Sequence, residues 1–381
     1  MIPGNTVFDC FINANILIVV AFALWRLARF GLEMIGLKHA YTVQLKLLNT
    51  IFLAIIFSPF VILGIQALRQ IGVGQSVNVN LSDIVVSYYL KGGFEMRATE
   101  FERLLSLRKT FAADVLQAGS WAAVVTLAAL ATGLVIGTAR LVHSVICLNT
   151  IVSSSYAWRR FGRVRIRLSD RVLVPFSTRG IWNYYVVIPS TMLGNTDEIK
   201  VSLAHEFQHL RQGDIEWEIL LELLKPLFFL NPVYHAWKRQ VEDLRELAVD
   251  SRLLTSGKVD IKSYSDTLLS VCQQSLRRDR VFIVAMPKVT LVTADRFSLR
   301  DKKVSFLEER IMRLFDARHL RHPKLAYAAV ILPLMAAILL ATVAIQSPGD
   351  WSQDRLMLSS VVNLERLEEI NRLSTLGRVR N

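Results

Sequence analysis

The stretch from 204 to 214 reads Ala-His-Glu-Phe-Gln-His-Leu-Arg-Gln-Gly-Asp and holds the side chains best suited to chemistry. On a helix, His205 and His209 project from one face because they are four residues apart, so both imidazoles can reach a single Zn²⁺. Glu206 lies close enough to act on a water bound to that ion. This HExxH pattern is typical of zinc-dependent hydrolysis, in which the carboxylate serves as the general base.

The helix predicted to carry this motif extends from Lys200 to Gln212. Its apolar residues are Val201, Leu203, Ala204, Phe207 and Leu210. They recur at helical spacing, so we expect the two histidines to face a dry interior and not solvent.

A third protein ligand is needed, because catalytic zinc sites usually take three and leave a fourth position for water. Glu246 is the best candidate, and it lies one helical turn before Asp250. Asp250 could accept the outer N–H of a ligand histidine and so fix its tautomer. Glu242, four residues before Glu246 on the same helix face, is the alternative ligand.

Further short motifs follow in a set order. They are Val187-Ile188-Pro189 before an acidic helix start, Arg211 to Asp214 after the histidines, Phe229 to Tyr234, the Glu246 and Asp250 pair, and Glu308 to Met312. From about Arg163 to Leu314, this order resembles the BlaR/MecR type of integral-membrane zinc endopeptidase, an antirepressor family that includes the β-lactam sensor-transducers. Val249 stands where a cysteine is common in that family, and Gln212 where a basic residue is common. Neither departure touches a proposed ligand.

The resemblance implies a gluzincin-like protease that uses Zn²⁺, held by His205, His209 and Glu246, with Glu206 as the base. Its substrate would be a protein or peptide, such as a cytosolic transcriptional repressor or the protein itself. Two other functions stay open: quality control of membrane proteins, and a non-catalytic signalling scaffold with a structural metal. The intact Glu206 argues against the scaffold, because a structural zinc needs no base. No penicillin-binding motif is present, so a β-lactam ligand is not implied.

Three side chains could polarise the carbonyl group of the bond to be cut, and the sequence does not rank them. They are His235, Arg245 and Tyr264. Because a lone histidine in an apolar segment more often packs than ligates, packing is the simpler interpretation of His235.

The composition indicates a membrane protein: 52% of the 381 residues are hydrophobic, and mean hydropathy is positive. Four apolar spans carry the excess: 11–24, 47–65, 118–141 and 325–345. The first is short enough to be a signal-peptide core, but it lacks a basic region before it and a convincing cleavage site. We therefore interpret all four spans as transmembrane helices.

Basic residues favour the cytosolic side of a membrane, and their distribution sets the expected topology. Residues 140–324 hold 30 Lys or Arg against 20 Asp or Glu, whereas 66–117 is nearly balanced with six against five. Both termini are therefore expected outside and the zinc motif in the cytosol. The basic residues are spread out and lack an interleaved aromatic platform, so direct nucleic-acid binding is not expected.

The expected fold is an α-helical membrane bundle of four transmembrane helices with an α+β gluzincin-like zinc protease domain inserted between the third and fourth. By resemblance the location is the bacterial inner membrane. The expected divisions are 1–65 (first two helices with a cytosolic loop), 66–117 (small extracytoplasmic segment), 118–141 (third helix), 142–324 (cytosolic protease domain), 325–346 (fourth helix) and 347–381 (extracytoplasmic amphipathic tail).

Strands are predicted ahead of the zinc helix. Residues 163–168 and 171–175 are expected to form a hairpin, and a further strand from Asn183 to Ile188 is halted by Pro189. A strand in that place can pair with an extended substrate along its free edge, and closure of the sheet is an equally good interpretation. The residues of the candidate edge strand are Tyr185, Val186, Val187 and Ile188.

The outer segment 66–117 is expected to contain a strand at 77–81 and a helix at 97–116, and it either binds a ligand or caps the bundle. Residues 215–230 carry four charges, which argue against a membrane crossing.

Residues 277–303 resemble an exposed loop with a weak strand at 281–285. Self-cleavage or a gate between Thr290 and Leu299 is one hypothesis, and a plain surface loop is the favoured one. The tail after 351 is predicted to be an amphipathic helix that lies on the outer face or contacts a partner, which could be a second copy in a homodimer. The three cysteines form no CxxC, so no disulfide framework is implied.

Overall fold

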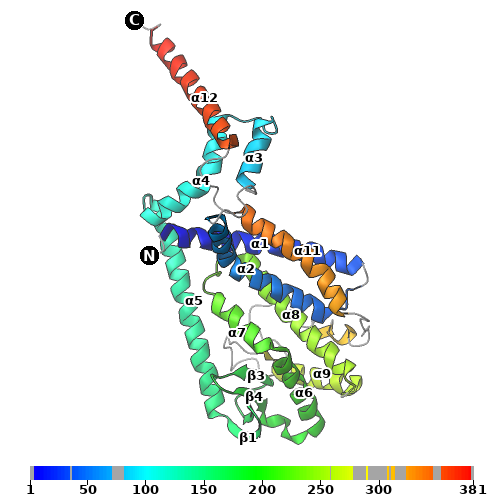
Figure 1. Ribbon diagram of the computed structural model, residues 1–381. Helices are drawn as coiled ribbons and strands as arrows, with labels where there is room; N and C mark the ends of the chain where they lie inside the picture. Colours follow the sequence, from blue (N-terminus) through cyan, green and yellow to red (C-terminus); the bar gives the residue numbers. More distant parts are fainter. Residues whose placement is uncertain are drawn as a thin grey trace. The chain divides into compact units, whose positions relative to one another are not determined.

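The computed structural model describes residues 4–34, 37–70, 81–257, 259–277, 289–290, 307–308, 310–313, 323–345 and 353–378. The chain is mostly helical, with one small sheet (Figure 1). Four described helices are long and apolar enough to cross a membrane: α1 (Gly4–Met34), α2 (Tyr41–Gln70), α5 (Trp121–Ser154) and α11 (Pro323–Ala344). Each contains most of one predicted span, so the prediction of four apolar helices long enough to cross a membrane is confirmed.

The third span differs most from its predicted bounds. The predicted span is 118–141, but α5 is one continuous helix of 34 residues that extends to Ser154. Ala118 ends the preceding helix in a left-handed conformation with φ of 50°, so α5 cannot begin there. Strand β1 (Tyr156–Phe161) begins two residues after α5 ends.

The chain divides into two compact units. One comprises Met1–Trp25, Ile51–Ala131 and Ile331–Asn381, and the other comprises Arg26–Thr50 and Thr132–Val330. Each of the four apolar helices therefore contributes one end to each unit.

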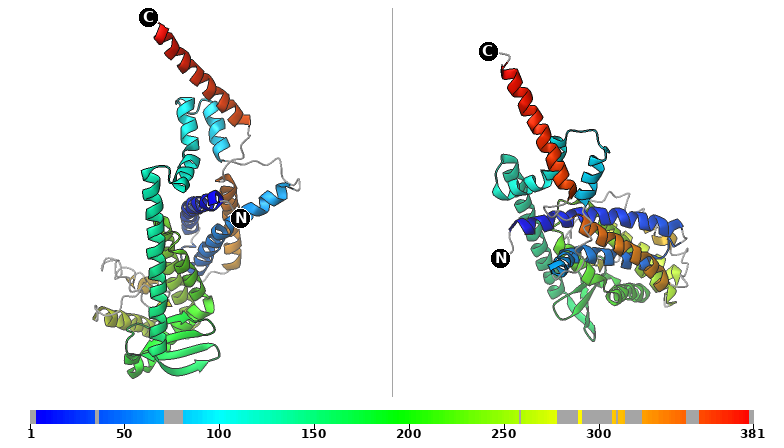
Figure 2. Two further views of the ribbon diagram at one scale, coloured as in Figure 1. Left: turned by 90° about the vertical axis from the view of Figure 1, so that its left-hand side faces the viewer. Right: turned by 45° about the horizontal axis from the view of Figure 1, so that its top comes forward.

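The first unit contains a small helical assembly of α3 (Leu81–Leu90), α4 (Ala98–Gln117) and α12 (Gln353–Arg378). Its buried core consists of Val86, Ala98, Phe101, Leu358 and Val362. Helix α12 thus packs against a part of the chain more than two hundred residues earlier (Figure 2).

Polar contacts reinforce this packing. Arg355 pairs with Asp83 at 2.9 Å, and the backbone N–H of Thr99 in the first turn of α4 donates to Glu365 at 2.9 Å. Because the first N–H groups of a helix have no partner within it, a carboxylate there stabilises the helix end. The predicted helix at 97–116 is confirmed as α4; of the predicted strand, 77–80 lie outside the described residues and Leu81 begins a helix.

Helix α12 confirms the predicted helical tail but not its amphipathic character. Beyond Val362 its apolar residues recur every three positions, at Leu364, Leu367, Ile370 and Leu373, and all four are more than half exposed. A step of three residues turns the position back by about 60° around the axis, so these side chains spiral around the helix and share no single face.

The second unit contains a five-stranded sheet. Its strands are β1, β2 (Val164–Ser169), β3 (Phe176–Arg179), β4 (Tyr184–Pro189) and β5 (Val289–Thr290), in the order β1-β2-β4-β3-β5. Strands β2 and β4 are parallel, and the other neighbouring pairs are antiparallel.

Two predictions about the strands are wrong. The hairpin joins β1 to β2 at Gly162, whose φ of 58° suits a tight turn, and 171–175 form no strand. Strand β4, with Tyr185, Val186, Val187 and Ile188, was a candidate free edge, but β2 and β3 pair with it on either side. It is therefore an interior strand.

Burial on both faces explains the unbroken apolar run of β4. Val186 and Ile188 pack against the helices that follow the sheet, while Val187 packs against Leu148 and Val152 of α5. Those following elements are η1 (Ser190–Gly194), α6 (Thr196–Gln212), α7 (Asp214–Leu224), α8 (Pro232–Thr255) and α9 (Ile261–Arg277). The sheet is thus held between the end of α5 and the helices that carry the HExxH motif.

The connection from α7 to α8 lies against a glycine face of α5. A Cβ atom at Gly133 would fall 1.9 Å from the Phe229 ring, and one at Gly137 would fall 3.0 Å from Pro226. Helix α7 has only 11 residues, too few to cross a membrane, as its charges predicted. The glycines therefore allow this connection to approach α5 closely.

The packing of α12 can be tested with two neighbouring valines. Val362 is 1% exposed and Val361 is 41% exposed. We expect Val362→Asp to destabilise the helical assembly by on the order of 3 kcal/mol, because it buries an unpaired charge. Limited proteolysis of the full-length protein should then cut within 353–378 much faster than in wild type. Val361→Asp is the control, and equal protection of both variants would contradict the packing.

Candidate metal centre

Helix α6 carries the HExxH motif at the centre of the second unit. Asn195 caps its start by accepting hydrogen bonds from the backbone N–H groups of Asp197 and Glu198. Its side chains at 205, 206 and 209 are fully buried, as the apolar wall predicted. Gly213 ends the helix with φ of 74°, a conformation that glycine adopts without strain, so α7 can begin directly at Asp214.

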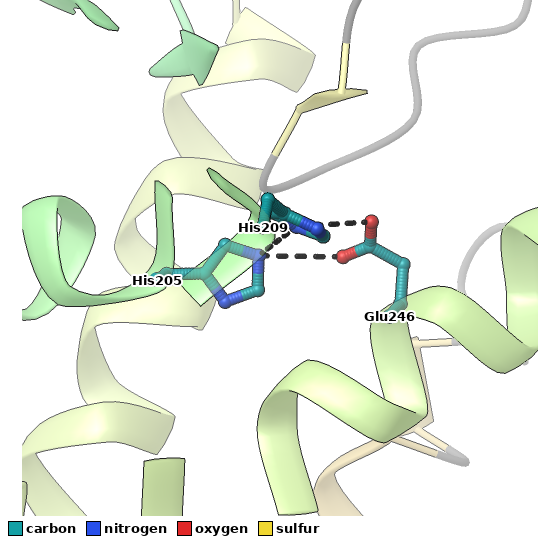
Figure 3. A group of neighbouring side chains, drawn as sticks. All are labelled: His205, His209 and Glu246. Carbon is teal, nitrogen blue, oxygen red and sulfur yellow. Dashed lines mark hydrogen bonds and ion pairs between the residues drawn. The ribbon is translucent and has the colours of Figure 1, made fainter. Parts of the chain in front are cut away.

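The two histidines and Glu246 converge on one point (Figure 3). The Nε2 atoms of His205 and His209 are 3.0 Å apart, and the Glu246 carboxylate lies 3.5 Å from the first and 3.7 Å from the second. Ligand atoms about 2.0–2.2 Å from a tetrahedral zinc are separated from one another by about 3.3 Å. The three residues therefore fit a zinc ion.

The environment of Glu206 is a second indication that this centre binds a further group. Its side chain is fully buried, and neither carboxylate oxygen has a hydrogen-bond partner within the described part of the chain. Buried carboxylates are normally hydrogen-bonded, because an unpaired one is costly. Burial raises the pKa of Glu206 well above its usual range. A water at this centre would give Glu206 its partner.

Each histidine has an outer partner that fixes its tautomer. His209 Nδ1 lies 2.8 Å from Asp214 Oδ2, and His205 Nδ1 lies 2.8 Å from the Tyr264 hydroxyl. Because Tyr264 donates its proton to Asp250, the His205 Nδ1–H donates to Tyr264. In both rings the proton on Nδ1 leaves the Nε2 lone pair for a metal.

These contacts revise the expected role of Asp250. Its carboxylate is 3.7 Å from His205 Nδ1, beyond a hydrogen bond, and it acts through Tyr264, which stands between them. Tyr264 was a candidate for polarising the substrate, but its hydroxyl is engaged on both sides. The sequence analysis assigned no role to Asp214. A carboxylate directly after Gly213, the glycine that ends α6, is the feature of the sequence that could have indicated its contact with His209.

Burial also sets the charge state of the ligands. It lowers the pKa of His205 to about 3 and lowers that of His209, so both imidazoles are neutral, the form that binds metal. Burial raises the pKa of Glu246. Burial outweighs the nearby Arg310 guanidinium, which lowers the pKa of Glu246, so the ionised carboxylate is disfavoured.

Glu242, the alternative ligand, belongs to a different cluster. Lys238 contacts Glu242 and lies 3.0 Å from Glu218 and 2.9 Å from Glu222. Arg245 donates to Glu218 at 2.7 Å, so this candidate for polarising the substrate is also held between α7 and α8. Burial would raise the pKa of Glu218, but Lys238 and Arg245 together lower it to about 2.

His235 does not join the centre. It lies in the first turn of α8, is exposed, and contacts the Phe229 carbonyl at 3.0 Å. It precedes Glu246 by eleven residues on the same helix, which corresponds to about 16 Å along the axis. The interpretation of His235 as a packing residue is therefore preferred to ligation.

Comparison with known proteins agrees with the geometry. A family model described as BlaR1 peptidase M56 matches residues 5–297, more than half of the chain. No curated protein matches the chain.

The role of Asp214 predicts a change in zinc affinity. Asp214→Asn should weaken zinc binding by about 10- to 100-fold, because an amide is a poorer acceptor for His209 Nδ1–H. Competition with a chelator on the purified protein measures this. Asp197→Asn is the control, since Asp197 is exposed on the same helix and pairs with the exposed Lys200 at 3.2 Å. Unchanged affinity in Asp214→Asn would remove this role.

The third ligand can be separated from its alternative by two substitutions. Glu246→Ala should purify without bound zinc, because two imidazoles alone hold the ion weakly. Glu242→Ala should keep a full equivalent, because its carboxylate contacts Lys238. Metal analysis of both proteins decides between them, and the reverse result would make Glu242 the ligand.

Proposed function

The chain belongs to the BlaR1 peptidase M56 family and is a membrane-associated metallopeptidase; from this premise we propose that it is a zinc endopeptidase with a cytosol-facing active site. It would cleave a cytosolic transcriptional repressor or itself. One observation carries the proposal: His205, His209 and Glu246 converge beside Glu206, a buried carboxylate without a described hydrogen-bond partner.

The chemistry proposed for the site is hydrolysis of a peptide bond. Bound zinc would act as a Lewis acid and lower the pKa of a water molecule. Glu206 would be the catalytic base: its carboxylate would take a proton from the attacking water and then deliver a proton to the leaving amine. His205, His209 and Glu246 would hold the ion, while Tyr264 and Asp214 keep the imidazole rings in orientation.

The sheet supports a way of binding an extended substrate. Strand β5 pairs antiparallel with β3, with Phe176 opposite Thr290 and Ser177 opposite Val289. Strand β3 therefore accepts an extended segment along the side away from β4, close to α6. We propose that a substrate takes the place of β5 along β3, where backbone pairing would give affinity that depends little on sequence.

The same pairing supports self-cleavage as one reaction. Val289 and Thr290 form β5, and the predicted cleavage region runs from Thr290 to Leu299. Residues 291–299 and the predicted weak strand at 281–285 lie outside the described residues. A segment of the chain already paired with β3 would be a natural first substrate, because no second molecule has to be recruited.

Contacts within each unit support the proposed topology. In the second unit, Arg29 donates to Gln240 at 3.0 Å, and the Thr50 and Tyr327 hydroxyls are 2.9 Å apart. These contacts tie the end of α1 to α8 and the start of α2 to the start of α11, so these four segments would lie on the cytosolic side. In the first unit, α12 packs on α3 and α4, which would lie outside. Four crossings of the bacterial inner membrane satisfy both sets of contacts, with the protease domain inserted between the third and fourth.

The proposed role of Glu206 as the general base can be tested by substitution. Glu206→Gln should keep one zinc per chain but lose peptide hydrolysis by about 10²- to 10⁴-fold, because the amide cannot take the proton. Zinc content and cleavage of a casein-type test substrate are measured on the full-length protein in detergent. Glu198→Gln, a second buried glutamate of α6 that accepts from Ser270, is the control. Retained hydrolysis in Glu206→Gln would refute this role.

The same variant identifies the kind of substrate. Proteomes of cells carrying wild type or Glu206→Gln are compared, together with the mass of the purified protein. One stabilised transcription factor, or loss of a wild-type nick near 290–299, supports the regulatory protease. Many stabilised membrane proteins would favour quality control, and identical proteomes would favour the scaffold.

A further inference from the structure

Arg310 is a fully enclosed cation beside the proposed metal centre. It belongs to the motif at Glu308 to Met312, and the described residues 310–313 form a helical turn. Its side chain is only 3% exposed. A buried arginine is stable only when anions surround it, so its partners show what it does.

The guanidinium contacts both carboxylates of α8 that face the centre. Its Nε and Nη2 atoms lie 2.8 Å from the two oxygens of Asp250, a bidentate pair, and Nη1 lies 3.1 Å from Glu246 Oε2. Five N–H donors in one plane make this double contact possible, and a lysine ammonium could not reproduce it.

The position of Glu246 depends on this contact. Glu246 and Asp250 are one helical turn apart and both buried, so their negative charges repel. Glu246 Oε2 lies between Arg310 and His205, at 3.1 Å from Nη1 and 3.5 Å from Nε2. The guanidinium therefore holds the carboxylate against the histidines and relieves the repulsion from Asp250.

Arg310 also reaches the other side of the centre through Asp250. That carboxylate accepts from Tyr264, whose hydroxyl accepts from His205 Nδ1. The guanidinium is thus connected to His205 through three successive hydrogen bonds, by way of Asp250 and Tyr264, and it contacts the Glu246 carboxylate directly.

We propose that Arg310 is a positioning residue of the metal centre, which fixes the Glu246 carboxylate where it can ligate zinc. This inference rests on the proposed zinc site. Arg310 comes from a segment about a dozen residues before α11, so the centre is completed by the stretch of chain that leads into the fourth membrane helix.

The test uses Arg310→Gln and Arg310→Lys in the full-length protein purified in detergent. Arg313→Gln is the matched control, because it removes the same charge three residues later, where the guanidinium lies over the Tyr41 ring at 5.2 Å. Zinc affinity is measured by chelator competition, and the coordination geometry by the visible spectrum after Co²⁺ substitution. Thermal unfolding of the metal-free proteins reports whether each variant folds.

We expect zinc affinity to fall by about 10- to 100-fold in Arg310→Gln, as for other partners of metal ligands, and by less in Arg310→Lys. The Co²⁺ spectrum should change in both, and Arg313→Gln should match wild type. Wild-type affinity and spectrum in a folded Arg310→Gln would overturn the inference; if that variant does not fold, the same result in Arg310→Lys would do so. If instead wild type binds no zinc, or Glu246→Ala keeps it, the proposed metal site fails and not only the role of Arg310.

Discussion

Two neutral imidazoles and a carboxylate meet where all three side chains are buried, and burying such groups is costly unless each has a partner. Burial lowers the pKa of His205 and His209 and raises that of Glu246, so each group is pushed toward its uncharged form. A divalent cation reverses this preference for the carboxylate, because it supplies the opposite charge at the point where the three meet. The centre is therefore built to be most stable when loaded.

Around that point, the helices and the turn after α6 restrain the orientation of the buried side chains. Helix α6 carries the two candidate ligand histidines on one face and the candidate base directly after the first of them, and the turn at Gly213 returns Asp214 to His209. Helix α9 brings Tyr264 to His205. Side chains that are already ordered bind a metal more tightly than side chains that must first be ordered, so the outer hydrogen bonds of the histidines would strengthen metal binding.

The motif and the apolar periodicity were enough to predict four long apolar helices, the ligand helix and the carboxylate of α8. Because an α-helix has 3.6 residues per turn, two histidines spaced four residues apart must share a helix face, and the sequence of that helix alone is enough to predict this. The partners of the ligands were harder to predict, because Tyr264 and Arg310 come from other elements and only the packing brings them together. The prediction that β4 is an edge strand was wrong for a related reason. Its apolar run is equally consistent with an edge strand and an interior strand, and only its pairing with β2 and β3 distinguishes the two. In α12, spacing of three residues resembles amphipathic spacing until its rotation is followed over several turns.

The distance in sequence between the parts of the centre affects when a newly made chain can first act. About a hundred residues separate His205 from Arg310, and a ribosome adds about 5 to 20 residues per second. A centre that needs Arg310 stays incomplete for several seconds after the HExxH helix has been synthesised. By then translation has nearly reached the last apolar helix, so the proposed centre would be completed only when α11 is about to be made.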